Sequence, residues 1–164
     1  MYADTAERIR AINIVGPFPK GDGNAEYLVV AINFFTKLVE TKPLRTITSK
    51  RIRDFFWESI VYRFGITNEI VSHNGRQYEG NPFRSWCQDL NIKQNFTSVA
   101  HPQANSQCEV KTEILCTLSK KRLGMKRKGW VDELPKVLWA HRTTHKNSTG
   151  ETPFSLVYGS EVVI

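Results

Sequence analysis

The sequence predicts an α/β fold: a mixed five-stranded sheet whose first three strands are antiparallel, with helices on both faces. Three observations support this prediction. Alternating apolar residues mark three strands in succession at the start of the chain, separated only by short turns. Two shorter apolar segments then alternate with stretches of helical spacing. The 164 residues suffice for one domain with a substantial core, so residues 1–164 are expected to form a single unit.

The first three strands are expected at Ile9–Val15, Tyr27–Asn33 and Leu38–Lys42. Glycine, proline and aspartate residues separate them, and turns this short favour an antiparallel meander. Two shorter strands are expected at Glu69–Ser72 and Ile92–Phe96. The first of these stops at His-Asn-Gly, which is typical of a turn.

Helices are expected between and after these later strands. The first follows a candidate N-cap at Thr48-Ser49 and ends before Gly65, with apolar residues recurring at helical spacing. A second opens at Asn81-Pro82, since proline favours the first helical turn. Residues 97–107 are polar and predict a loop. Three more helices should follow: one carrying Val110 to Leu118, a long one from Trp130 to His141, and a short one over Pro153–Tyr158.

Composition narrows the class of protein. The chain is 40% hydrophobic and 11% aromatic, as folded globular domains are. It has no apolar run long enough to span a bilayer and no apolar signal-peptide core at its start. The three cysteines are an odd number without Cys-x-x-Cys spacing, which favours a reducing compartment. We therefore expect an intracellular protein, nuclear or cytoplasmic, that is not secreted.

A strong positive charge points to a polyanionic partner. The chain carries 23 basic and 16 acidic residues, for a formal net charge of +7. Nucleic acid is the commonest partner of such a protein. The candidate phosphate contacts cluster in the second half of the chain: Lys111, Lys120, Lys121, Arg122, Lys126, Arg127 and Lys128.

Two polar motifs carry most of the functional signal. The segment Val71–Tyr78 reads Val-Ser-His-Asn-Gly-Arg-Gln-Tyr, and His101–Glu109 reads His-Pro-Gln-Ala-Asn-Ser-Gln-Cys-Glu. Thirty-five residues, 74–108, separate His73 from Glu109. These motifs resemble the active site of retroviral-type integrases, where Ser-Asp-Asn-Gly is followed at the same spacing by the glutamate of Asn-Gly-Gln-x-Glu. His73 and Ser106 are departures from that pattern.

Further segments extend the resemblance over about residues 9–163. Residues 12–17, Ile-Asn-Ile-Val-Gly-Pro, resemble the family's first acidic strand with Asn13 in place of aspartate. Asn33 likewise stands where the family's Ala-Ile-Asp-Tyr-Phe-Thr-Lys stretch has aspartate. Several matches are typical of gypsy-type long-terminal-repeat retrotransposon integrases: residues 100–105, Leu138-Trp-Ala140, and Gly150-Glu-Thr-Pro-Phe154. The resemblance implies an RNase H-like fold and a DNA-integrating polynucleotidyl transferase of a retrotransposon polyprotein.

The implied chemistry requires Mg²⁺ or Mn²⁺ held by three carboxylates, at the positions of Asn13, His73 and Glu109 here. Mg²⁺ prefers oxygen ligands, whereas asparagine offers one neutral oxygen and histidine a nitrogen. Only Glu109, with His73 weakly, remains as a metal ligand. We therefore predict a metal bound poorly or not at all, and impaired catalysis.

Two alternatives stay open. The domain could be an active transferase with altered metal use, in which His73 and Glu109 hold one Mn²⁺. It could instead be a domesticated, non-enzymatic protein-interaction module. The resemblance implies DNA bound with weak sequence specificity and a homodimer as partners. We expect neither membrane association nor a small-molecule substrate.

Overall fold

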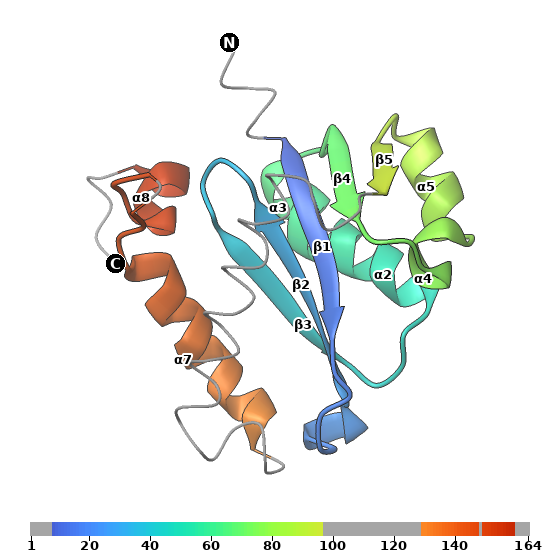
Figure 1. The fold of residues 1–164 in the computed structure, drawn as a ribbon, viewed down its shortest axis with the longest axis horizontal. Coiled ribbons are helices and arrows are strands. Elements are labelled where there is room, and N and C mark those ends of the chain that lie inside the picture. The colour runs from blue at the N-terminus through green and yellow to red at the C-terminus, as the bar shows by residue number, and fades with distance from the viewer. Residues whose placement is uncertain (1–7, 97–128, 148, 160–164) are drawn as a thin grey trace.

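A five-stranded sheet in the order β3-β2-β1-β4-β5 organises the domain (Figure 1). The computed structural model describes residues 8–96, 129–147 and 149–159. The strands are β1 (Ile9–Val15), β2 (Tyr27–Asn33), β3 (Val39–Leu44), β4 (Glu69–Ser72) and β5 (Lys93–Phe96). Strands β1, β2 and β3 pair antiparallel, whereas β4 pairs parallel with β1, and β5 parallel with β4. The predicted mixed sheet is confirmed.

The third strand ends later than the sequence predicted. The expected strand stopped at Lys42 because Pro43 lacks a backbone N–H, but Pro43 lies inside β3 and pairs with Leu28. A proline is tolerated here because β3 is an edge strand, with a neighbour on one side only. The fifth strand begins at Lys93, one residue later than expected.

One continuous helical run crosses the sheet after β3. It comprises α2 (Ser49–Phe56), the π-helical turn η2 (Trp57–Val61) and α3 (Tyr62–Phe64). The Thr48 hydroxyl accepts a hydrogen bond from the Arg51 N–H at 3.2 Å, which confirms the predicted N-cap. Gly65, with a φ of 91°, ends the run.

The remaining elements are short except for one. They are η1 (Asp22–Asn24), α4 (Arg76–Glu79), α5 (Phe83–Asp89), α7 (Trp130–Thr143) and α8 (Pro153–Tyr158). The single-turn elements η1 and α4 were not anticipated, because one turn is too short to show helical periodicity. The helix expected to carry Val110 to Leu118 lies outside the described residues.

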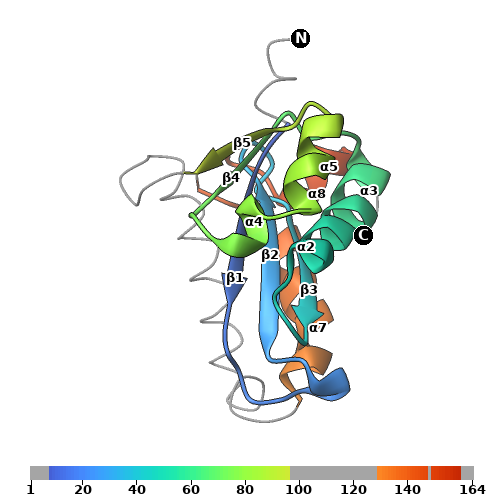
Figure 2. The ribbon, with the colours of Figure 1, turned by 90° about the vertical axis from the view of Figure 1, so that its right-hand side faces the viewer.

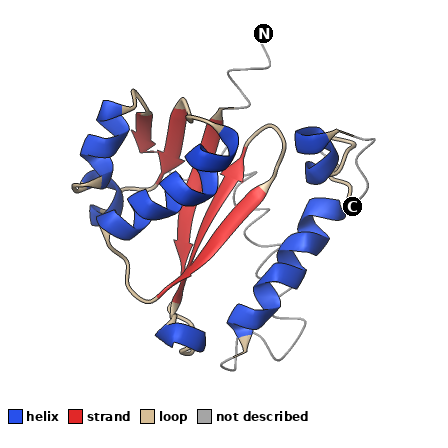
Figure 3. Cartoon of the chain, turned by 180° about the vertical axis from the view of Figure 1, so that it is seen from behind, coloured by secondary structure: helices blue, strands red, loops and turns tan. Residues whose placement is uncertain are grey.

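Alternation along the strands divides the core into two layers. Ile12, Val29 and Ile70 pack against the first layer of helices, which are α2, α4 and α5. Figure 3 views the sheet from this side, and Figure 2 shows the sheet edge-on with these helices beside it. Ala11 and Val30 face the opposite way and pack against α7. Helices therefore cover both faces, as predicted. None of the helices in the described ranges is long and apolar enough to cross a membrane.

Candidate functional site

Asn13 and His73 lie at the same level of the sheet. Strands β1 and β4 run parallel, and paired residues differ by sixty positions: 9 with 69, 10 with 70 and 11 with 71. Continuing this register places position 73, the residue directly after β4, beside position 13. The structure thus brings together the two sequence-predicted site residues that it describes.

Asn13 presents a neutral, half-buried side chain. It lies within β1 and pairs with Val30 of β2. Its neighbours two positions away, Ala11 and Val15, pack in the core layer under α7, so strand alternation places Asn13 on that face. Its Oδ1 atom accepts a hydrogen bond from the Ile14 N–H at 2.8 Å. The one side-chain oxygen at this position thus already accepts a local hydrogen bond.

His73 is exposed, but the backbone on either side of it is firmly held. Ser72 before it is buried within β4. After it, α4 is anchored through Tyr78, which is 3% exposed and whose pKa is raised by burial. The Gln94 amide of β5 donates to the Tyr78 carbonyl oxygen at 2.8 Å. The position of His73 is therefore set by a buried strand and a packed turn.

The other predicted site residues lie outside the described residues. They are Glu109, the third position of the triad, and the basic residues Lys111, Lys120, Lys121, Arg122, Lys126, Arg127 and Lys128. Their roles stay predictions. Within the described ranges, no group of three or more histidine, cysteine, aspartate or glutamate side chains could hold a metal ion. The described half of the site, an amide and an imidazole, does not fit Mg²⁺.

Asn33 has a structural role that the sequence did not reveal. It is 3% exposed at the end of β2, and its Oδ1 atom accepts hydrogen bonds from the N–H groups of Phe35 and Thr36, both at 2.9 Å. This Asx turn shapes the connection to β3. The sequence signal that could have predicted this turn is an asparagine at the end of a predicted strand, followed by Phe-Phe-Thr.

A buried ion cluster on β3 was also missed. The Glu40 side chain is 7% exposed, and its Oε1 atom lies 3.0 Å from Arg63 Nη1 and 2.8 Å from Arg142 Nη2. Burial lowers the pKa of the nearby Arg10 to about 10, and the charge of Glu40 opposes that shift. Three basic side chains thus surround one carboxylate. Such a carboxylate is neutralised by arginines and is not available to a cation.

Helix α7 also reaches the β2–β3 turn through His141. Its Nε2 atom lies 2.9 Å from the Lys37 carbonyl oxygen, and the side chain is 3% exposed. His145 falls beyond the helix, which ends at Thr143, and is exposed. The two histidines therefore do not share a helix face.

Comparison with known proteins places the chain among retroviral Pol proteins. It is 30% identical over 138 residues to the Gag-Pol polyprotein of avian reticuloendotheliosis virus, 84% of this chain and 12% of that protein. It is 32% identical over 136 residues to the Gag-Pol polyprotein of feline leukemia virus, 82% of this chain and 8% of that protein. It is 25% identical over 149 residues to the retrovirus-related Pol polyprotein from transposon 412 of Drosophila melanogaster, which covers 90% of this chain. No family model matches the chain.

Solved structures agree on the fold. The catalytic core domain of BIV integrase superposes with a TM-score of 0.72 at 14% identity, covering 94% of this chain and 96% of that one. The HTLV-2 integrase catalytic core domain in complex with magnesium gives a TM-score of 0.71 at 18% identity, covering 91% and 95%. The protein thus has the RNase H-like fold of integrase catalytic cores. It belongs to the retroviral-type integrase cores found in the Pol polyproteins of retroviruses and long-terminal-repeat retrotransposons.

The chain spans only 12% of the reticuloendotheliosis virus and transposon 412 polyproteins. The activity and partners of such larger proteins are therefore matters for proposal.

Proposed function

We propose that this integrase core binds DNA but does not join DNA strands. The observation that carries the proposal is the β1–β4 register, which places Asn13 and His73 at one level of the sheet. The family's chemistry places carboxylates at both positions, because two divalent cations must be balanced by negative charge. Here both side chains are uncharged or cationic, which leaves Glu109 as the single remaining carboxylate of the triad.

DNA binding is supported by charge rather than by the metal site. A net charge of +7 favours a polyanion, and phosphate contacts make such binding steeply salt-dependent. The proposed contacts include Lys111 and the two clusters at 120–122 and 126–128. One chain of a simian T-cell lymphotropic virus intasome superposes on this chain with a TM-score of 0.73 at 20% identity. This likeness supports the proposal that the fold can bind DNA.

Metal affinity distinguishes a catalytically impaired core from an active enzyme. The HTLV-2 core was solved with magnesium, whereas we propose that this chain takes up Mg²⁺ or Mn²⁺ poorly or not at all. The rival is one Mn²⁺ held by His73 and Glu109, since imidazole accepts Mn²⁺ more readily than Mg²⁺. A chain that bound Mn²⁺ and processed DNA ends would favour that rival.

The test restores the two carboxylates. Titration calorimetry with Mg²⁺ should show almost no uptake by the present chain and clear uptake by the double variant Asn13→Asp with His73→Asp. A matched control, Asn33→Asp, adds a carboxylate at the β2–β3 turn and should leave Mg²⁺ uptake unchanged. Tight Mg²⁺ binding and strand transfer by the unmodified chain would contradict the proposal.

We also propose that the domain forms a homodimer through the surface beside the β3 edge. Trp57, Tyr62 and Trp139 are 49%, 79% and 61% exposed, unusual for such large apolar side chains. Tyr62 precedes Arg63, and Trp139 lies one helical turn before Arg142, so both flank the Glu40 ion cluster. A cavity of about 480 Å³ beside Trp139 is lined by Pro135, Lys136 and Ala140.

The HTLV-2 core has been solved in a dimeric form, which supports a second copy as the occupant of this surface. Sedimentation equilibrium should show that Trp139→Ser weakens self-association. Phe96→Ser, on β5 at the opposite edge of the sheet, removes a comparable exposed aromatic side chain (37% exposed) and should not. Equal behaviour of both variants would exclude this surface.

A further inference from the structure

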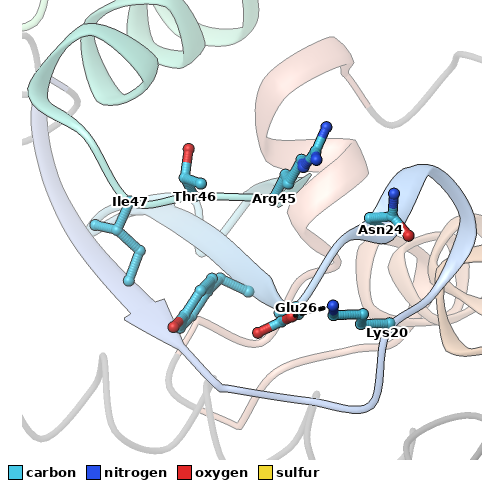
Figure 4. Close-up of a pocket in the computed structure, with 7 residues that line it drawn as sticks. Lys20, Asn24, Glu26, Arg45, Thr46 and Ile47 are labelled. Atoms are coloured by element: carbon cyan, nitrogen blue, oxygen red, sulfur yellow. Dashed lines mark ion pairs between the residues drawn. The ribbon is translucent and has the colours of Figure 1, made fainter.

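A polar cavity of about 570 Å³ lies at the end of the sheet where β1 stops (Figure 4). Two loops enclose it: the β1–β2 connection, which carries η1, and the segment between β3 and α2. Its lining residues are Lys20, Asn24, Glu26, Tyr27, Arg45, Thr46 and Ile47. None of these belongs to the site at Asn13 and His73.

Backbone contacts hold the β1–β2 connection in shape. The Phe18 N–H donates to the Glu26 carbonyl at 2.6 Å, and the Glu26 N–H donates to Leu44 of β3 at 3.0 Å. From the other side, the indole N–H of Trp130, a fully buried residue of α7, donates to the Pro19 carbonyl at 2.8 Å. The cavity is therefore framed by bonds to two neighbouring elements.

The lining offers hydrogen-bond donors and positive charge. Arg45 is exposed and has no ion-pair partner within the described ranges. Lys20 lies 3.7 Å from Glu26, but its side chain is 67% exposed, so its ammonium group remains accessible. Asn24 and Thr46 add an amide and a hydroxyl. Figure 4 shows that Lys20 and Arg45 belong to different loops and that Lys20 points toward Glu26. An anion with several acceptor oxygens fits this lining.

The cavity lies within reach of DNA placed on the candidate site. Asn13 pairs with Val30, and Tyr27 of the cavity lies three residues farther along β2, about 10 Å at ~3.3 Å per residue. Along one DNA strand, phosphates recur about every 3.4 Å of helix axis. The cavity and the candidate site therefore lie at the same end of the sheet, and their separation along β2 is close to the span of three base steps.

We propose that this cavity, through Lys20 and Arg45, is an accessory binding site for a phosphodiester group of nucleic acid. The inference rests on the proposed DNA binding and adds a specific contact to it. The ligand is the DNA backbone, and a free phosphate compound is the alternative source of the same chemistry. Since the contacts are to phosphate, the site contributes affinity without sequence preference.

The test compares two charge-matched double variants. Lys20→Gln with Arg45→Gln changes the cavity, and Arg84→Gln with Lys93→Gln removes two exposed charges from α5 and β5 near the opposite edge. The dissociation constant for a short duplex is measured for each across a range of salt concentrations. Relative to the control, the cavity variant should bind several-fold more weakly, and the slope of log K against log salt should fall by about 1 to 2.

The outcomes separate this inference from the proposed function. If the unmodified chain fails to bind the duplex, the proposed function itself is wrong. If it binds and the two variants weaken binding equally, DNA binding stands and the cavity has no part in it. Calorimetry with pyrophosphate tests the other source of phosphate. If the cavity variant no longer takes up pyrophosphate but binds the duplex as tightly as the control variant does, the cavity binds free phosphate compounds. That result would overturn the inference.

Discussion

Arg142 of α7 lies 2.8 Å from Glu40 of the edge strand β3, Nη2 to Oε1. The same Nη2 atom donates to the Val39 carbonyl oxygen at 3.1 Å. One guanidinium therefore joins α7 both to a backbone carbonyl of the edge strand and to the carboxylate of the next residue. An edge-strand carbonyl would otherwise be free to pair with another chain.

Removing the carboxylate should destabilise the domain strongly. Glu40→Ala leaves Arg10 and Arg142 without their shared counter-charge, and breaking a buried pair in this way costs about 3 kcal/mol or more. The exposed pair of Lys42 and Glu58 provides the control, because Glu58→Ala should cost less than about 1 kcal/mol. Urea denaturation measures both. Equal losses would show that the Glu40 cluster contributes no more than a surface pair.

The Asn33 turn gives a second prediction about stability. Asn33→Ala removes the acceptor for two backbone N–H groups and should lower the free energy of unfolding by about 1–3 kcal/mol. Asn33→Asp keeps that acceptor and should lose less. Thermal unfolding of the two variants compares them. A larger loss for aspartate than for alanine would mean that burying the charge outweighs the turn hydrogen bonds.

Local sequence patterns predicted most helices and strands of the described residues, but they could not predict long-range side-chain contacts. Strands β1, β2 and β4 and helix α8 begin and end where alternation and capping residues placed them. The proximity of Asn13 and His73 agrees with the sequence resemblance, which implied that both positions belong to one metal site. The pairing of Glu40 with Arg142 could not, since it joins residues 102 positions apart through the packing of a helix beside an edge.

Burial of Cys87 predicts a pH effect of known sign. Burial raises the pKa of its thiol to about 12 from an ordinary value of 9.0. Above pH 9 the unfolded thiol ionises while the folded one keeps its proton, so stability is lost as pH rises from about 9 toward 12. At pH 10 this loss is about 1.4 kcal/mol.

The variant Cys87→Ala isolates that contribution. Its stability should be lower at pH 8 because of the vacated core volume, but it should fall less between pH 8 and pH 10 than that of the unmodified chain. Urea denaturation at both pH values gives the double difference, in which other titrating groups cancel. A double difference near zero would show that the buried thiol ionises as readily as an exposed one.

The β1–β2 connection beside the cavity depends on glycine at position 16. Gly16 has a φ of +133°, and a Cβ atom there would lie 2.6 Å from the Glu26 carbonyl oxygen, a backbone atom that cannot simply rotate away. Gly23 in the same connection also has a positive φ, +71°, but a Cβ atom there would meet nothing within 4 Å. Gly23→Ala should therefore cost about 1–2 kcal/mol from backbone strain alone. Gly16→Ala adds a steric clash and should cost more. Because Glu26 lines the cavity, Gly16→Ala should also weaken duplex binding.

Thermal unfolding and duplex titration of the Gly16→Ala and Gly23→Ala variants measure both effects. Equal costs would indicate that the connection shifts freely, and the rigid frame assigned to the cavity would then be wrong.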